Sequence, residues 1–147
     1  MSTHFHPLKV KEIVAETPEC VSVAFEVPAD LQENFKFKAG QYLTFKTTLN
    51  NEEVRRSYSI CTAPHENELR VAIKQVQDGK FSTFANQTLK VGDTLDTMVP
   101  TGTFCINKEN GITHKSYLGF VAGSGITPLF GIIKDVLAND PTSTFTL

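Results

Sequence analysis

The chain has 147 residues, of which 40% are hydrophobic, and a formal net charge of -2 at pH 7. Its 14 lysines and arginines are scattered along the sequence, so it lacks the concentrated basic face that nucleic-acid binding requires. No stretch approaches the roughly 18 apolar residues of a membrane span, and the N-terminus lacks the apolar run of a signal peptide. These features predict a cytoplasmic protein with neither a nucleic-acid nor a membrane partner.

The cysteines and histidines show no spacing that is typical of a metal site. The three cysteines are odd in number and widely separated, which fits neither a disulfide framework, nor a zinc site, nor an iron–sulfur cluster. The four histidines match no ligand pattern either. We therefore predict that this group of residues binds no metal: Cys20, Cys61, Cys105, His4, His6, His65 and His114.

Apolar residues alternate with polar ones in short runs from Leu8 to Val99, and turn residues separate these runs. This pattern is typical of an antiparallel sandwich or barrel. Roughly six strands can be drawn before Phe104, and closing them into a barrel would leave no edge exposed. Clear examples of such runs are Val21–Val27, Tyr42–Thr47 and Leu69–Ile73.

One segment departs from the alternation. Phe81, Phe84, Ala85 and Leu89 recur near helical spacing, after a glycine at position 79. We predict a short helix here that caps the barrel, with Phe81 and Phe84 packed into the core. Glycine and proline turns then bracket one more strand.

A second unit follows a polar stretch, residues 107–111, which we interpret as an interdomain linker. The run Tyr117–Ala122 is continuously apolar, as expected of a parallel strand that is buried on both faces. Apolar residues from Leu129 to Leu137 then follow the i, i+3, i+4, i+7, i+8 pattern of an amphipathic helix. That helix should stop at Asn139–Pro141, and residues 142–147 should begin a second strand.

A glycine-rich loop, Gly123-Ser124-Gly125-Ile126-Thr127-Pro128, lies between the apolar strand and the amphipathic helix. Phosphate-binding loops occupy this position in nucleotide-binding domains. We expect Thr127 to cap the helix and Pro128 to occupy its first turn, so that free amides and the helix dipole favour a pyrophosphate. The alternative is an ordinary strand-to-helix turn, because the third glycine of the usual fingerprint is missing.

The segment Arg55–Ile60 combines a guanidinium, an aromatic ring and two hydroxyl groups on one predicted strand. Alternation puts Arg56 and Tyr58 on one face and Ser57 and Ser59 on the other. Such a set suits a flat ligand that carries phosphates, because tyrosine can stack on a ring system and arginine can neutralise phosphate. By itself the segment also fits an exposed strand with a cross-strand arginine and a half-buried tyrosine.

Six short motifs succeed one another along the chain: Gly40-Gln41-Tyr42, Arg56-Ser57-Tyr58-Ser59, Gly79-Lys80-Phe81-Ser82, Gly92-Asp93, Pro100-Thr101-Gly102-Thr103-Phe104 and Gly123 to Pro128. Their order and approximate spacing resemble those of the ferredoxin-NADP⁺-reductase family. The chain looks closest to the NADH-type reductase components of oxygenases, and it is also similar to flavohaemoprotein and cytochrome b5 reductase modules. Each motif is weak alone, whereas the ordered series is specific.

The resemblance implies roles for the matched residues. Arg56 would bind the flavin pyrophosphate, and Tyr58 would stack on the isoalloxazine ring. Ser57, between them, would also be a cofactor-binding residue. The two implied catalytic residues are Ser59, whose hydroxyl would lie near flavin N5, and Thr127, between flavin and nicotinamide. The other implied cofactor-binding residues are Ile73 and Lys74 on a strand whose backbone contacts the flavin, Gly79, Lys80, Phe81 and Ser82 around the pyrophosphate, and Gly123, Ser124, Gly125 and Pro128 at the dinucleotide site. Lys74 and Lys80 also fit simple surface charge.

The resemblance also implies a fold and an activity. The fold would be mainly β, with an antiparallel Greek-key FAD-binding barrel at residues 1–106. Residues 107–147 would form the first βα(β) unit of a Rossmann-like α/β NAD-binding domain. The implied cofactors are FAD and either NADH or NADPH, with the nicotinamide site incomplete here, because family members continue into a complete parallel-sheet domain. We therefore expect the chain to be part of a longer protein.

These expectations lead to one main prediction of function. The chain would be the FAD-binding part of an NAD(P)H-dependent oxidoreductase, which passes hydride from nicotinamide to flavin and electrons on to an iron–sulfur or oxygenase acceptor. One alternative is a non-catalytic flavin-binding or protein-docking module. Another is a flavin-free barrel in which Arg56 and Tyr58 have only structural roles.

Overall fold

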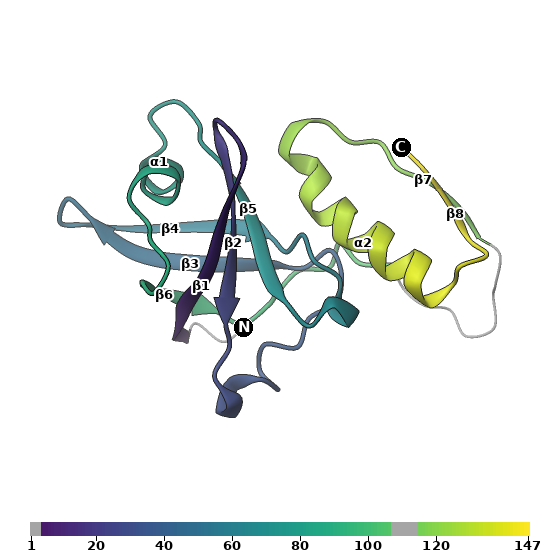
Figure 1. The fold of residues 1–147 in the computed structure, drawn as a ribbon, viewed down its shortest axis with the longest axis horizontal. Helices are drawn as coiled ribbons and strands as arrows, with labels where there is room; N and C mark the ends of the chain where they lie inside the picture. Colours follow the sequence, from purple (N-terminus) through teal and green to yellow (C-terminus); the bar gives the residue numbers. More distant parts are fainter. Residues whose placement is uncertain (1–3, 107–114) are drawn as a thin grey trace.

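The computed structural model describes residues 4–106 and 115–147, so the predicted linker at 107–111 lies outside the described residues. The first range folds into one antiparallel sheet of six strands, in the spatial order β4-β3-β6-β1-β2-β5 (Figure 1). A bridge between Ile60 and Val71 joins the two edges of this sheet at one end, which makes the sheet a Greek-key barrel, as predicted. The strands are β1 (Phe5–Thr17), β2 (Cys20–Glu26), β3 (Tyr42–Leu49), β4 (Glu52–Ser59), β5 (Leu69–Lys74) and β6 (Thr94–Met98).

The barrel core consists of the apolar residues of the alternating runs, because successive side chains of a strand point to opposite faces. Phe45 of β3 is fully buried at its centre. Its ring stacks on Phe25 at a centroid distance of 5.1 Å and on Phe81 at 5.9 Å. The other fully buried apolar side chains of the strands and the loop after β4 are Leu8, Val10, Val23, Ala24, Leu43, Ile60, Ala63, Val71, Ile73 and Leu95.

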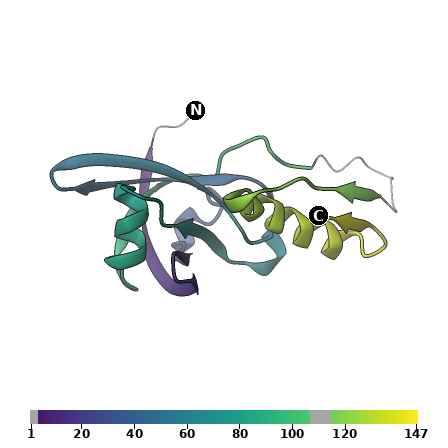
Figure 2. The ribbon, with the colours of Figure 1, turned by 90° about the horizontal axis from the view of Figure 1, so that it is seen from above.

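The helix α1 (Lys80–Gln87) closes one end of the barrel beside β4, as predicted (Figures 1 and 2). Of its three apolar positions at helical spacing, Phe81 and Ala85 are buried, and Phe84 is partly buried against the core. The Asn86 amide ties the helix to β5 by donating to the carbonyl oxygen of Ile73 at 3.0 Å. The helix ends earlier than its apolar pattern, since Leu89 is buried beyond its last residue.

The second unit consists of β7 (Ser116–Leu118), α2 (Ile126–Asn139) and β8 (Thr144–Thr146), and the two strands pair in parallel. Tyr117 and Phe145 face each other in this register, and their rings stack at 5.4 Å. Three single-turn 3₁₀ helices complete the described structure: η1 (Ala29–Leu31), η2 (Pro64–Glu66) and η3 (Gly123–Gly125). Within the described ranges, no helix has the length and apolar character needed to cross a membrane.

The helix α2 packs directly against the barrel, on the side opposite α1 (Figures 1 and 2). A Cβ atom at Gly131 would lie only 2.8 Å from the carbonyl oxygen of Thr62, so this close approach requires glycine. One turn away from this contact, Lys134 forms an ion pair with Glu66 of η2 at 2.6 Å. Ile132 also belongs to a small apolar cluster with Ala39, which lies in the loop before β3.

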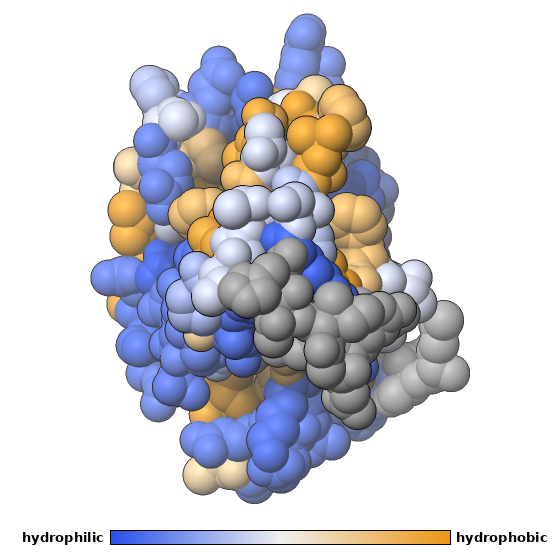
Figure 3. Space-filling model, turned by 90° about the vertical axis from the view of Figure 1, so that its right-hand side faces the viewer, coloured by the Kyte–Doolittle hydropathy of each residue, from blue (hydrophilic) through white to orange (hydrophobic). Residues whose placement is uncertain are grey.

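The predicted burial of the strand at 117–122 is wrong. The observed strand β7 ends at Leu118, and Leu118 and Phe120 are exposed, the latter by 89%. The physical reason is that β7 pairs only with β8 in the described chain, and α2 covers one face of this two-stranded sheet. Apolar side chains are therefore visible on this side of the molecule (Figure 3).

Truncating Phe45 tests the aromatic core. We expect Phe45→Ala to lower the free energy of unfolding by about 3–5 kcal/mol, because the surrounding rings cannot fill the cavity. The matched control is Phe120→Ala, which removes an exposed ring and should change stability by less than about 0.5 kcal/mol. Urea denaturation followed by circular dichroism measures both, and equal losses would contradict the assigned core.

Candidate functional site

The strand β4 presents two chemically different faces, as its alternation predicts. Val54 is buried in the barrel core, and Arg56 and Tyr58 follow it on the same face. Ser57 points to the other face, where its hydroxyl lies 2.8 Å from that of Thr44 on β3. The pairing of Ser57 with Thr44 gives this side chain a structural partner, whereas the Arg56 and Tyr58 face adjoins α1.

Tyr58 combines a supported ring with a polar end. Its ring centroid lies 5.6 Å from that of Phe81 and 6.3 Å from that of Phe45, so the core holds one side of it in place. The side chain is half-buried. Burial raises the pKa of the Tyr58 phenol above its ordinary value of 10.0, and the nearby Arg56 charge opposes this shift. A neutral, partly exposed ring of this kind can stack on a planar ligand.

The N-terminus of α1 is open to an anion. Gly79 is its N-cap, no side chain caps the helix, and its first turn holds no acidic residue. The first backbone amides of a helix have no intrahelical partner and lie at the positive end of its dipole, so they favour a phosphate. A Cβ at Gly79 would overlap the hydroxyl oxygen of Ser82, which explains the glycine at this turn.

The side chains of Phe81 and Ser82 face inward. Phe81 is 1% exposed and belongs to the core, as we expected from helical spacing. Ser82 is 4% exposed, and its hydroxyl accepts a hydrogen bond from the Val76 amide and donates one to the Gly79 carbonyl. Both side chains therefore fix the turn before α1, and only the backbone amides of these residues remain for a ligand.

Two cationic side chains accompany this helix end. Lys80, the first residue of α1, forms an ion pair with Glu52 of β4 at 2.5 Å. Arg56 donates from Nη1 to the carbonyl oxygen of Arg55 at 2.7 Å. Arg56 also lies close enough to Glu52 to contribute to the lowered pKa of that carboxyl, although hydrogen bonding from Lys80 is the larger cause. Binding of a diphosphate requires cations and backbone amides of this kind in one place.

The strand β5 reaches this region through its last two residues. Ile73 is fully buried, and its carbonyl oxygen accepts the hydrogen bond from Asn86 of α1. Lys74 ends the strand and is exposed. The structure thus brings the end of β5 next to α1, with the Ile73 carbonyl engaged by the helix.

The glycine loop lies at the start of α2. Gly123 has a φ of 55° and the loop is exposed. Pro128 falls in the first turn of α2, as expected. The prediction that Thr127 caps the helix is wrong, because α2 begins at Ile126 with Gly125 as N-cap and Thr127 lies inside the first turn. The Thr127 hydroxyl instead donates to the carbonyl oxygen of Ser124 at 2.9 Å.

The two halves of the site are related through the contact between α2 and the barrel. Thr127 stands one helical turn before Gly131, on the same face of α2. Gly131 lies against the carbonyls of Ile60 and Thr62, in the segment that directly follows Ser59. The beginning of α2 is therefore held on the side of the barrel where β4 ends, while α1 lies beside the rest of β4 (Figure 1).

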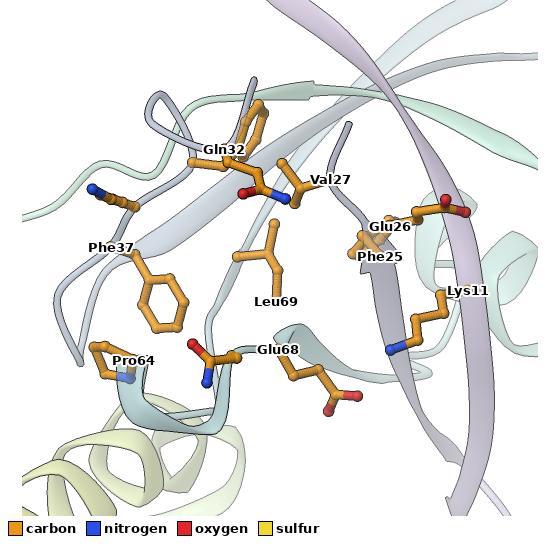
Figure 4. A pocket seen from close by; sticks show the side chains of 12 residues that line it. Lys11, Phe25, Glu26, Val27, Gln32, Phe37, Pro64, Glu68 and Leu69 are labelled. Carbon is orange, nitrogen blue, oxygen red and sulfur yellow. The ribbon is translucent and has the colours of Figure 1, made fainter. Parts of the chain in front are cut away.

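An open cavity of about 900 Å³ lies elsewhere on the barrel, beside η2 (Figure 4). Its wall includes Phe37 and Leu69, and Lys11, Glu26 and Glu68 contribute charged groups to its edge. None of the residues implied by the resemblance lines this cavity. The residues implied for the cofactor lie instead around β4, α1 and the start of α2.

Sequence reasoning missed Glu52 and Asn86, although both contact residues of the candidate site. Glu52 shares a strand face with Arg56, four residues away, and this spacing could have drawn attention to it. Its partner Lys80 is 28 residues away, so no local pattern shows the pair. Asn86 bridges α1 and β5 through its side-chain amide, and that contact also depends on tertiary packing.

A protein-family model described as an oxidoreductase FAD-binding domain matches residues 7–106. The chain belongs to this family. The match covers the barrel and α1, which are the elements that carry Arg56, Tyr58 and the open helix end. The family assignment therefore agrees with the predicted FAD-binding barrel.

Relatives of this FAD-binding domain protein include components of oxygenase systems. It is 42% identical to one of the subunits of 1,2-phenylacetyl-CoA epoxidase from Escherichia coli (strain K12), over 99% of this chain and 40% of the relative. It is 33% identical to the ferredoxin reductase component of 3-ketosteroid-9-alpha-monooxygenase from Rhodococcus rhodochrous, over 88% of this chain and 36% of the relative. The chain thus spans about two-fifths of the length of these relatives.

The fold is also that of known reductases. A ferredoxin NADP⁺ reductase from Neisseria gonorrhoeae, solved with bound FAD and NADP, superposes with a TM-score of 0.77 at 24% identity. The superposition covers 98% of this chain and 57% of that one. The expected architecture is therefore confirmed: a Greek-key barrel followed by a βα(β) unit.

Alkaline titration tests the burial of Tyr58. Its pKa is raised in the folded chain, so the stability that the neutral phenol contributes is present below pH 10 and is lost as pH rises through the folded pKa. We expect phenolate absorbance to show a transition above the ordinary tyrosine range, and Tyr58→Phe should abolish it. Tyr42→Phe is the control and should retain it. A transition that survives Tyr58→Phe would disprove the assignment.

Proposed function

We propose that this chain binds FAD with its diphosphate at the N-terminus of α1 and its isoalloxazine ring against Tyr58. The observation that supports this most is the juxtaposition of Arg56, Tyr58 and the uncapped end of α1 on one face of β4. FAD suits the donor set better than FMN, because a diphosphate matches two cationic side chains beside a helix end. The Ser59 hydroxyl, at the end of β4, would lie near flavin N5.

The start of α2 supports a nicotinamide dinucleotide as the second cofactor. Its loop has glycines at positions 123 and 125, and no side chain caps the helix, so its first amides favour a pyrophosphate. Thr127 would stand between the flavin and the nicotinamide. In this division, residues 1–106 hold FAD and residues 107–147 contribute the first part of the NADH or NADPH site.

The proposed activity is that of an NAD(P)H-dependent electron-transfer reductase. Bound FAD would supply the chemistry of hydride acceptance and of single-electron release to an acceptor. The chain's own residues position the two cofactors and exclude water from one side of the flavin, which Tyr58 and its aromatic neighbours would cover. The names of the relatives, one from an epoxidase and one a monooxygenase reductase component, support an iron–sulfur or oxygenase acceptor.

Charge removal at Arg56 tests the flavin site. We expect Arg56→Ala to weaken FAD binding about tenfold or more, because a charge-assisted contact to the diphosphate is lost. Tyr58→Ala should also weaken it. Arg55→Ala is the matched control, since Arg55 lies on the opposite face of β4 and pairs with Glu53. Fluorescence titration of the purified chain with FAD gives the Kd of each variant, and circular dichroism verifies the fold. Equal affinities for all variants would disprove the site.

The identity and reduction of the flavin separate the proposed reductase from a binding module. Mass spectrometry of flavin released from the purified protein should identify FAD. In the full-length protein, NADH or NADPH should bleach the flavin absorbance under anaerobic conditions. A flavin that binds but is not reduced by either nucleotide would favour a non-catalytic module.

A further inference from the structure

The carboxylate of Glu52 pairs with Lys80, one of the two cations assigned to the proposed diphosphate. Glu52 begins β4, shares a face with Arg56, and its Oε2 lies 2.5 Å from the Lys80 ammonium. Lys80 is the first residue of α1. One carboxylate thus contacts the cation at the helix end, and Arg56 lies near enough to influence its ionisation.

The positive charges at the start of α1 favour a carboxylate beside Lys80. A lysine in the first turn is unfavourable, because the helix dipole already places positive potential at that end. No acidic residue of α1 itself offsets this charge in the first turn. Glu52, reaching across from β4, supplies the missing anion. A bound diphosphate would satisfy the same groups with the same sign of charge.

From this arrangement we propose that the Glu52 carboxylate competes with the FAD diphosphate for Lys80 and thereby limits flavin affinity. The inference rests on the proposed function, because it concerns the affinity of the same site. It makes Glu52 a residue that tunes retention of the cofactor. When flavin binds, Lys80 then exchanges its ion pair with Glu52 for an ion pair with the diphosphate.

The fold does not need the Glu52–Lys80 pair. Both side chains are more than half exposed, 61% for Glu52 and 54% for Lys80, and exposed ion pairs contribute little to stability. By contrast, Arg70 is 14% exposed and pairs with both Glu68, just before β5, and Glu12 of β1. A pair that contributes little to stability but engages one cation of the proposed ligand site is expected to act on the ligand.

The test compares Glu52→Gln with Glu53→Gln. Glu53 is the adjacent carboxylate, is similarly exposed, and pairs with Arg55 on the other face of β4. We expect Glu52→Gln to tighten FAD binding about two- to fivefold, the range set by the loss of an exposed competing ion pair. Glu53→Gln should leave the Kd unchanged. Fluorescence titration measures both, and Glu52→Ala provides a second variant without the amide group.

Riboflavin serves as the probe for the mechanism, because it has the ring system without phosphate. If Glu52 competes with the diphosphate, the affinity for riboflavin should be the same in the wild type and in Glu52→Gln. An unchanged or weaker affinity for FAD in both Glu52 variants, or an equal gain for riboflavin, would overturn the inference while leaving the proposed function intact. Failure of the wild type to bind FAD would overturn the proposed function itself.

Discussion

The insertion of Phe81 into the aromatic core fixes α1 beside β4 in the candidate site. Its ring contacts both Phe45, at the centre of the barrel, and Tyr58, at the edge of the site. Because Phe81 is the second residue of α1, burying it fixes the first turn of the helix beside β4. One apolar contact therefore places both the Tyr58 ring and the uncapped start of α1.

Polar contacts then refine this placement without occupying the ligand-binding groups. Ser82 closes the turn before α1, and Asn86 ties the helix to the carbonyl oxygen of Ile73. These side chains satisfy buried polar atoms of the protein, which would otherwise cost stability. The amides at the start of α1 are left without a side-chain cap. A helix that is anchored along its body and uncapped at its start is suited to bind an anion at that end.

Much of this arrangement could be predicted from the sequence, because it follows from local periodicity. Alternation located the strands and separated Arg56 and Tyr58 from Ser57, and helical spacing put Phe81 in the core. The exposure of Phe120 could not be predicted, since it depends on how many strands pair with β7. Thr127 was misassigned as the cap because α2 begins earlier than expected: its N-cap lies two residues before Thr127, so the Thr127 hydroxyl falls in the first turn. The Glu52–Lys80 pair needs tertiary proximity that no local pattern contains.

The second unit depends on the barrel in a similar way, through one small residue and one ion pair. Gly131 allows the α2 backbone to approach the carbonyls of Ile60 and Thr62, immediately after β4. Glu66 then accepts hydrogen bonds from both Lys134 and the Ala63 amide; burial raises its pKa, but these bonds outweigh burial and hold it below the ordinary value. The same carboxylate thus shapes the loop that leaves β4 and orients the helix that carries Thr127. Because α1 packs beside β4 and α2 packs against the segment that follows it, the barrel sets the separation of the two helices.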